Sequence, residues 1–153
     1  MRKYLFIALS LIFFVGTVFA MGGVPKQKAS AHADVATVAK GSQVIAYYFH
    51  GNFRCYTCHT MEQYSKEAIE ANFKDALSSE KLQFKVVNTD ESGNEHFVTD
   101  YKLYTKSLVL SLVKDGKEVK SNNLTKIWEY VRDKQKFYDY VSEEVNNYLK
   151  EAK

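Results

Sequence analysis

The feature that most constrains this 153-residue chain is a pair of cysteines, Cys55 and Cys58, set between a strand pattern and a helix pattern. The run 44–49 is β-branched and aromatic, which predicts a buried strand. After Cys58, apolar residues recur at three- and four-residue spacing, which predicts a helix. A disulfide can close across two intervening residues only where the backbone turns, as it does at a helix start. The unpaired N–H groups and the positive dipole end of a helix N-terminus both stabilise a thiolate, so the spacing predicts redox chemistry.

The two sulfurs should have different roles. We expect Cys55, nearer the helix terminus, to be exposed and to attack a disulfide, and Cys58, one turn inside, to be shielded and to resolve the mixed disulfide. Arg54 and His59 flank the pair, and we expect their charge to lower the pKa of Cys55. The predicted function is that of a thiol–disulfide oxidoreductase, an enzyme that exchanges two electrons with a protein thiol or disulfide partner or with a membrane reductant.

Two other functions use the same residues. Residues 55–59 read CxxCH, the attachment sequence of c-type haem, so a monohaem electron carrier with His59 as proximal ligand is one alternative. A non-enzymatic accessory module that keeps the pair for structure is the other. A four-residue loop makes a weak staple, roughly 2 kcal/mol, which favours exchange. A zinc site that adds His50 would need ligands at the adjacent positions 58 and 59, which is awkward for a tetrahedron. We therefore expect no cofactor and no metal.

The N-terminus has the pattern of an exported protein. Residues 1–20 have a basic start, an apolar run and a terminal Ala20, which predicts a signal peptide, and an uncleaved leader would instead be a membrane anchor. Residues 21–42 are expected to form a flexible tether and residues 43–153 one domain, a monomer in the periplasm or outside the cell. Disulfides persist there. The formal charge of +3 falls toward zero without the leader, which gives no case for nucleic-acid binding.

The remaining pattern predicts an α/β domain with the order β-α-β-α-β-β-α. The expected strands are 44–49, 82–88, 108–113 and 118–120, and the expected helices run from 57 or 58 to Ser78, and over 94–101, 124–132 and 137–149. Two strand–helix–strand crossovers imply parallel pairing, and Asp115-Gly116 predicts an antiparallel hairpin. The result is a central mixed sheet flanked by helices.

Three segments in this order resemble the thioredoxin-like superfamily: the strand that leads into Cys55-x-x-Cys58, the sequence VNTD at 87–90, and residues 101–117. The resemblance covers roughly residues 43–150 and implies a single thioredoxin-like domain. More narrowly, FRCYTCHTMEQYS and LYTKSLVLSLVKDGKEVK resemble an exported thioredoxin-like family catalogued as a nitrophenyl-compound nitroreductase subunit. The chain has no Gly-rich dinucleotide fingerprint, and we do not infer nitroreduction from that name.

The sequence departs from the superfamily at three places. Arg54 stands where a tryptophan is usual, and residues 46–49 contain no carboxylate where a buried acid is usual. The stretch 105–107 lacks the usual cis-proline, whose loop faces the cysteines. The resemblance would put Lys106 near Cys55, where its ammonium would lower the pKa of that thiol further; a solvated loop lysine is the equal alternative.

Several other residues are candidates for contact with a partner. Phe53 and Tyr56 flank the first cysteine, and we expect them to form an apolar rim for a partner protein. Ser107, in the loop that would face the cysteines, is a further candidate for docking. Trp128 is expected to pack in the core, and His96 to lie on the surface.

Overall fold

The structure, a computed structural model, describes residues 41–153. The predicted signal peptide, 1–20, and nearly all of the predicted tether, 21–42, lie outside the described residues. The first strand begins at Ser42, at the end of the predicted tether. Within residues 41–153, no helix combines the length and the hydropathy needed to cross a membrane.

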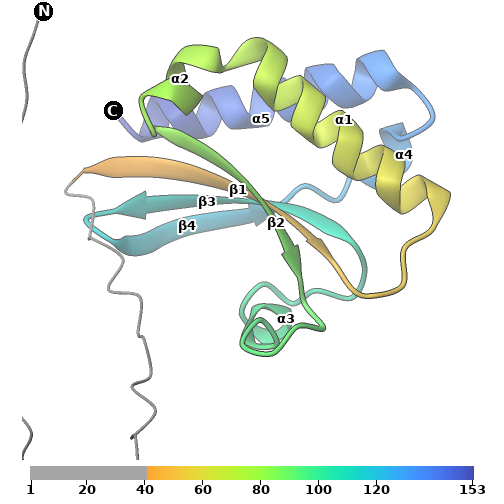
Figure 1. The fold of residues 1–153 in the computed structure, drawn as a ribbon. Coiled ribbons are helices and arrows are strands. Elements are labelled where there is room, and N and C mark those ends of the chain that lie inside the picture. The colour runs from red at the N-terminus through yellow and green to blue at the C-terminus, as the bar shows by residue number, and fades with distance from the viewer. Residues whose placement is uncertain (1–40) are drawn as a thin grey trace, which may run out of the picture. The chain divides into compact units, whose positions relative to one another are not determined.

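The described residues form a four-stranded mixed sheet with the strand order β2-β1-β3-β4 (Figure 1). Strand β1 pairs in parallel with β2 and antiparallel with β3, and β3 pairs antiparallel with β4. The strands are β1 (Ser42–His50), β2 (Leu82–Asn88), β3 (Ser107–Lys114) and β4 (Lys117–Asn123). The mixed α/β sheet and its Asp115-Gly116 hairpin are confirmed.

The parallel pairing predicted for the second crossover is wrong, because β3 runs antiparallel to β1. The connecting helix α3 (His96–Asp100) is too short to carry the chain back along the sheet. Five helical residues rise about 7.5 Å, whereas a seven-residue strand such as β2 is about 23 Å long. Residue 107 therefore lies opposite Phe49, at the end of the sheet where β2 finishes, and β3 can only run back.

Two long helices, α1 (Tyr56–Asn72) and α5 (Lys134–Glu151), cover one face of the sheet (Figure 1). The first predicted helix is divided at Phe73, whose φ of −130° interrupts it before α2 (Lys74–Ser78). The helical stretch predicted over 124–132 is shorter and is α4 (Ile127–Tyr130). Asp133 then accepts a hydrogen bond from the N–H of Lys136 at 3.1 Å and caps α5.

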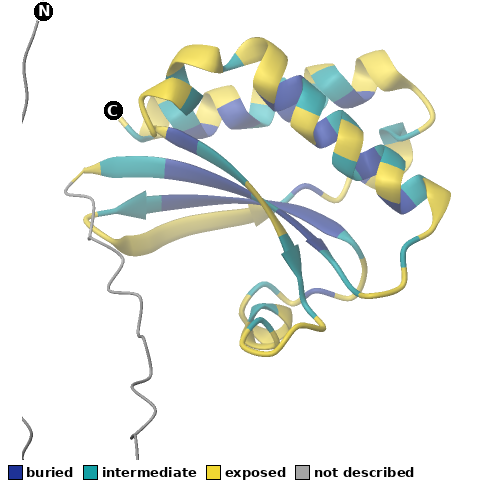
Figure 2. Ribbon diagram, in the orientation of Figure 1, coloured by how far each residue is buried: buried dark blue, intermediate teal, exposed yellow. Residues whose placement is uncertain are grey.

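The core lies between this helical layer and the sheet (Figure 2). Val44, Ala46 and Tyr48 alternate along β1 toward the helices, and all three are fully buried. The last predicted helix, 137–149, lies within α5, and its buried stripe has helical spacing: Phe137, Val141, Val145 and Tyr148. Because α1 packs against α5 and both helices cover the core, the core holds α1 above the central strand β1.

A second cluster lies on the opposite face of the sheet, next to α3. Tyr47 and Phe49 of β1 pack against Phe97 and Tyr101, with ring centroids between 5.2 and 6.2 Å apart. Phe97 and Tyr101, from the predicted helical segment 94–101, therefore pack against the sheet, whereas Val98 of the same segment is exposed. This cluster holds the segment after β2 against the end of β1.

A polar contact joins α1 to α5. The Glu67 carboxylate accepts hydrogen bonds from the Tyr138 hydroxyl and from Gln63, and pairs with the Lys134 ammonium at 2.9 Å. These contacts, that of Tyr138 foremost, lower the pKa of Glu67 from 4.5 to about 2. The ionised form of Glu67 is therefore favoured in the folded protein.

We expect this contact to make stability depend on acid pH. A lowered carboxyl pKa contributes stability above the unfolded value, here 4.5, and that contribution is lost as the pH falls toward 2. Glu67→Gln should therefore remove part of the decline in urea midpoint between pH 4.5 and pH 2. The matched variant is Glu70→Gln, on the same helix with only a 3.8 Å exposed pair to Lys66. Equal pH profiles for the two variants would refute a specific role for Glu67.

Candidate active site

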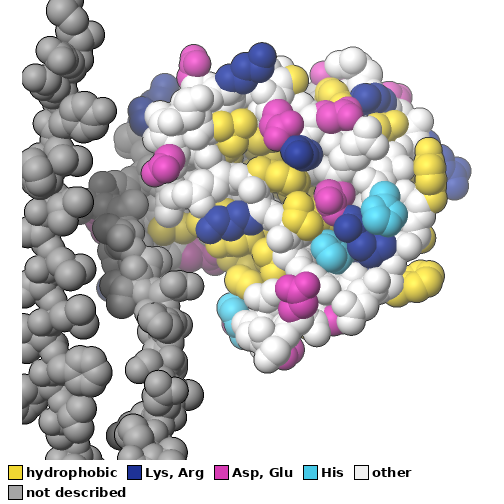
Figure 3. Space-filling model, in the orientation of Figure 1, with side chains coloured by type: hydrophobic (Ala, Val, Ile, Leu, Met, Phe, Trp, Pro, Cys, Tyr) yellow, Lys and Arg dark blue, Asp and Glu magenta, His cyan; other side chains and the backbone are white. Residues whose placement is uncertain are grey.

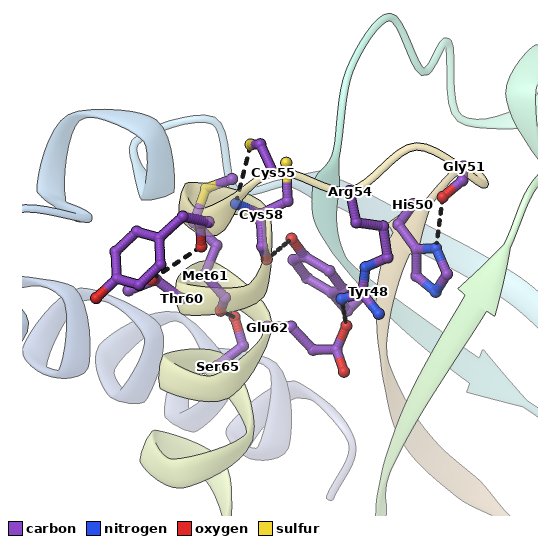
Figure 4. A network of polar contacts seen from close by, with 11 residues as sticks. Tyr48, His50, Gly51, Arg54, Cys55, Cys58, Thr60, Met61, Glu62 and Ser65 are labelled. Carbon is purple, nitrogen blue, oxygen red and sulfur yellow. Dashed lines mark hydrogen bonds and ion pairs between the residues drawn. The ribbon is translucent and has the colours of Figure 1, made fainter.

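The two cysteines lie where the loop from β1 enters α1 (Figure 4). Cys55 is the N-cap residue of the helix, in an extended conformation, and its Sγ accepts a hydrogen bond from the N–H of Cys58 at 3.4 Å. Both thiols are free; Cys55 is exposed, and Cys58 is only 2% exposed. The predicted placement of an outer and a shielded sulfur at a helix start is confirmed, while their chemical roles stay predictions.

The environment of Cys55 favours its thiolate. A hydrogen bond from the Cys58 side chain is the largest cause that lowers the pKa of Cys55 below its ordinary value. The backbone N–H groups of Cys58 and Thr57 lower it further. These donors belong to the first turn of α1, whose N–H groups have no partners within the helix. The first-turn N–H groups of α1 thus add to the lowering of the Cys55 pKa, after the larger contribution of the Cys58 side chain.

Tyr48 lies directly beneath the cysteine pair. Its hydroxyl donates a hydrogen bond of 2.6 Å to the carbonyl oxygen of Cys58, and its side chain is fully buried. Burial, with the nearby charges of Cys58 and Glu62, raises the pKa of Tyr48 far above its ordinary value, so the phenol stays protonated. The strand pattern predicted that Tyr48 is buried but gave it no role. The signal in the sequence was that the hydroxyl of a buried tyrosine needs a hydrogen-bond acceptor.

Arg54 folds back along α1 instead of standing beside Cys55. Its guanidinium pairs with the Glu62 carboxylate, and the two side chains are 20% and 25% exposed (Figure 4). The Nε atom of Arg54 is buried and finds no hydrogen-bond partner within the described part of the chain. The geometry gives Arg54 a carboxylate partner. The predicted effect of the Arg54 charge on the pKa of Cys55 stays a prediction. No sequence pattern identified Glu62, which lies one turn beyond Cys58, as part of the site.

The two other candidate tuning residues, His59 and Lys106, lie in α1 and in the loop before β3. His59 is exposed in the first turn of α1. The Lys106 ammonium lies 5.9 Å from the centre of the Phe53 ring, so its contact is with the rim. Figure 3 shows histidine, basic and acidic side chains side by side near the loop between β1 and α1. Among residues 41–153, no group of three or more His, Cys, Asp or Glu side chains could hold a metal ion.

The aromatic rim is exposed as predicted, with Phe53 at 78% and Tyr56 at 87%. Ser107 differs, because it is 3% exposed and its hydroxyl donates to the Thr105 carbonyl at 3.0 Å, so its side chain is not on this surface. The core position predicted for Trp128 is wrong. Trp128 is 39% exposed, and its indole N–H reaches the Lys106 carbonyl at 3.0 Å, which draws it out of the core.

Trp128 also lines an open groove beside α1. The groove runs between the first turns of α1 and the segment that holds α4, and its lining residues are Tyr56, Thr57, Thr60, Tyr64, Trp128, Glu129, Val131 and Arg132. Tyr56 and Trp128, both exposed aromatic side chains, thus line this groove next to the first turn of α1.

The loop between β1 and Cys55 is fastened to the end of β2. The N–H of Thr89 donates to the His50 carbonyl at 2.7 Å, and the N–H of Asn52 donates to Oδ2 of Asp90 at 2.7 Å. A Cβ atom built on Gly51 would lie 2.7 Å from the same Asp90 oxygen. The carboxylate can approach the loop this closely only because residue 51 has no side chain.

We expect Gly51→Ala to destabilise the protein by about 1 kcal/mol, the value of a lost hydrogen bond. The added methyl group would push Asp90 away from the Asn52 N–H. Urea denaturation measures this cost. In an Asp90→Ala background the same substitution should cost much less, because the obstructing oxygen is gone. Additive costs in the double variant would show that Asp90 is not the obstacle.

The chain was compared with protein-family models, curated proteins and solved structures. No protein-family model matches the sequence, and no curated protein matches it either. Among solved structures, the chain is similar to oxidised thioredoxin O2 from Arabidopsis thaliana, at 14% identity and a TM-score of 0.39, over 63% of this chain and 76% of that one. It is also similar to Fasciola hepatica thioredoxin, at 25% identity and a TM-score of 0.35, over 61% and 81% of the two chains.

At these TM-scores the likeness carries no argument of its own, and the fold assignment depends on the sheet. The central β1 has a parallel neighbour reached through a helix on one side and an antiparallel hairpin on the other. The cysteine pair stands where β1 gives way to the first helix. The described residues therefore have a thioredoxin-like α/β fold, with a Cys55-x-x-Cys58 pair at the start of α1.

Proposed function

We propose that this protein is a thiol–disulfide oxidoreductase that acts through Cys55 and Cys58. The observation that supports it best is the asymmetry of the pair. One sulfur is exposed at a helix N-terminus, and the other is buried one turn behind it. A staple has no need of an exposed, polarised sulfur, whereas exchange requires a thiolate that a partner can reach.

The chemistry follows from this arrangement. The Cys55 thiolate attacks one sulfur of a partner disulfide, and the partner's other sulfur leaves as a thiolate that takes up a proton. Cys58 then loses its proton and attacks the Sγ of Cys55, which releases the first partner sulfur as a second thiol. Two electrons pass to the partner, and the protein is left with a Cys55–Cys58 disulfide. The same steps in reverse would oxidise a dithiol partner.

The position of Cys58 suits the second step. A buried thiol is closed to bulky partners, and the Cys58 backbone nitrogen lies 3.4 Å from the Cys55 sulfur, so both cysteines belong to one tight turn. Holding two reacting groups close converts their reaction into an intramolecular one. Tyr48 anchors the carbonyl of Cys58 and so fixes the turn that carries both sulfurs.

The setting of the activity belongs to the same proposal. A leader over 1–20 would export the protein to the periplasm or beyond, where a monomer without a bound cofactor would meet a protein disulfide or a membrane reductant. Phe53 and Tyr56 would contact such a partner. The narrower resemblance to the nitrophenyl-compound nitroreductase subunit family rests on two sequence segments, and we extend no activity from it.

A turnover assay tests the proposed function. The purified protein should accelerate the dithiothreitol-dependent reduction of a disulfide-bonded model peptide, and alkylated protein should not. A Soret band in protein made in a haem-attaching host would instead support the c-type alternative. A pair that resists both reduction and exchange would leave the accessory-module alternative and contradict the proposal.

A further inference from the structure

The ion pair beside the cysteines has an unusual arrangement. Arg54 is the residue next to Cys55, so their Cα atoms are about 3.8 Å apart. Its guanidinium nevertheless runs away from the exposed sulfur and binds Glu62, on the second turn of α1. Both side chains are mostly buried, at 20% and 25% exposure, and Figure 4 shows them on the far side of Tyr48 from the Cys55 sulfur.

The Arg54–Glu62 ion pair includes a polar atom that is buried without a partner in the described part of the chain. Within residues 41–153, the Arg54 Nε is buried without a partner, a cost that the contact with Glu62 must offset. Without a carboxylate at position 62, nothing described there would hold the guanidinium in this half-buried place. The long arginine side chain could then turn outward, toward the exposed sulfur of the adjacent Cys55.

We propose that Glu62 is a positioning residue that holds the Arg54 guanidinium against α1 and thereby withholds its charge from the sulfur of Cys55. The inference rests on the proposed function for its significance, since the charge near Cys55 sets how readily the pair is reduced. Glu62 then acts through Arg54 and touches neither the sulfur nor the partner.

The electrostatics of Cys55 agree with this arrangement. The causes that most lower its pKa are hydrogen bonds from Cys58 and from the backbone at the start of α1. Arg54 is not among these leading causes, although it is the adjacent residue. His59 lies in the first turn of α1 and the Lys106 ammonium lies over the Phe53 ring, and within the described residues neither side chain pairs with Glu62.

Release of Arg54 should stabilise the thiolate. Opposite charges within a few ångströms lower an acid's pKa, and exposure to water weakens the effect. We expect Glu62→Gln to lower the measured pKa of Cys55 by about 0.5. The reduced form would gain up to about threefold, which is about 15 mV in reduction potential, and the protein would become more oxidising.

A cycle of four proteins tests the inference: wild type, Glu62→Gln, Arg54→Gln and the double variant. The rate of Cys55 alkylation against pH gives its pKa, and glutathione equilibria give the potential. Glu62→Gln alone should lower the pKa, while Arg54→Gln and the double variant should match the wild type. This replaces the expectation from the sequence that Arg54 lowers the pKa of Cys55 in the wild-type protein, because its guanidinium is paired with Glu62. Arg54→Lys combined with Glu62→Gln should restore the lowered pKa, because it restores the mobile charge.

The outcomes separate the possible causes. If Glu62→Gln has no effect, or has the same effect without Arg54, the inference is overturned, because the glutamate then acts directly or not at all. Glu70→Gln, an equal loss of charge farther along α1, should leave Cys55 unchanged. Glu62→Ala carries the same expectation should Glu62→Gln fold poorly.

Alkylation does not require turnover. A protein without exchange activity can therefore still show the coupling of Glu62 to Arg54, and an active protein can lack it. The two proposals can fail independently.

Discussion

Cys55→Ser should abolish thiol–disulfide exchange, with a fall in rate on the order of a thousandfold or more, as expected when a nucleophile is removed. A serine hydroxyl at the N-cap of α1 would still accept the N–H of residue 58, so the helix start should survive. The lost property is the thiolate, which only a cysteine at this exposed position supplies. The turnover assay with dithiothreitol and a disulfide-bonded peptide measures the effect.

Cys58→Ser is the matched variant, and its expected failure is of a different kind. It should attack a disulfide once and then accumulate as a stable mixed disulfide at Cys55, visible as a mass increase that dithiothreitol removes. Without the buried sulfur, no internal thiol can displace the partner. If Cys55→Ser formed that adduct and Cys58→Ser did not, the assigned roles would be reversed.

Phe137→Ala should destabilise the fold by about 3–5 kcal/mol, because it leaves a large cavity in the core. Phe137 is fully buried on α5, and the ring of Tyr64 on α1 meets it edge-on, with 5.6 Å between centroids. The residue therefore supports the helix that begins with the cysteines. Urea denaturation of the reduced protein measures the loss.

The neighbouring Lys136→Ala is the control, since that side chain is 69% exposed and its substitution should cost within about 0.5 kcal/mol. Loosening of the core should also raise the alkylation rate of Cys58, which the folded protein shields. A cost below about 1 kcal/mol for Phe137→Ala would contradict the packing of α5 against α1.

The regular elements of this fold could be predicted because their patterns are local. Residues 82–88 were expected as a strand and form β2 with the same bounds. The buried stripe of α5 was equally readable, since it follows helical spacing. The direction of β3 could not be predicted, because the connections from β1 to β2 and from β2 to β3 look alike in sequence. Only the length of α3 shows that the second one cannot return along the sheet.

Some parts of the candidate site could likewise be predicted from the sequence, and others could not. The placement of Cys55 and Cys58 follows from their spacing at a helix start. The Arg54–Glu62 pair spans eight residues and joins a loop to a helix face, a contact that no sequence period describes. Trp128 was misplaced because its indole N–H finds its acceptor on a distant loop, at the Lys106 carbonyl. Side chains with polar tips are placed by partners that only the fold brings near.

The most direct test of the account is a redox titration of the protein in glutathione buffers, with the state of both cysteines read by alkylation and mass spectrometry. The account predicts one reversible two-electron transition between a dithiol and a Cys55–Cys58 disulfide, at a potential above the roughly −300 mV of structural bridges. A pair that stays oxidised below that potential, or that forms no internal disulfide at all, would contradict it.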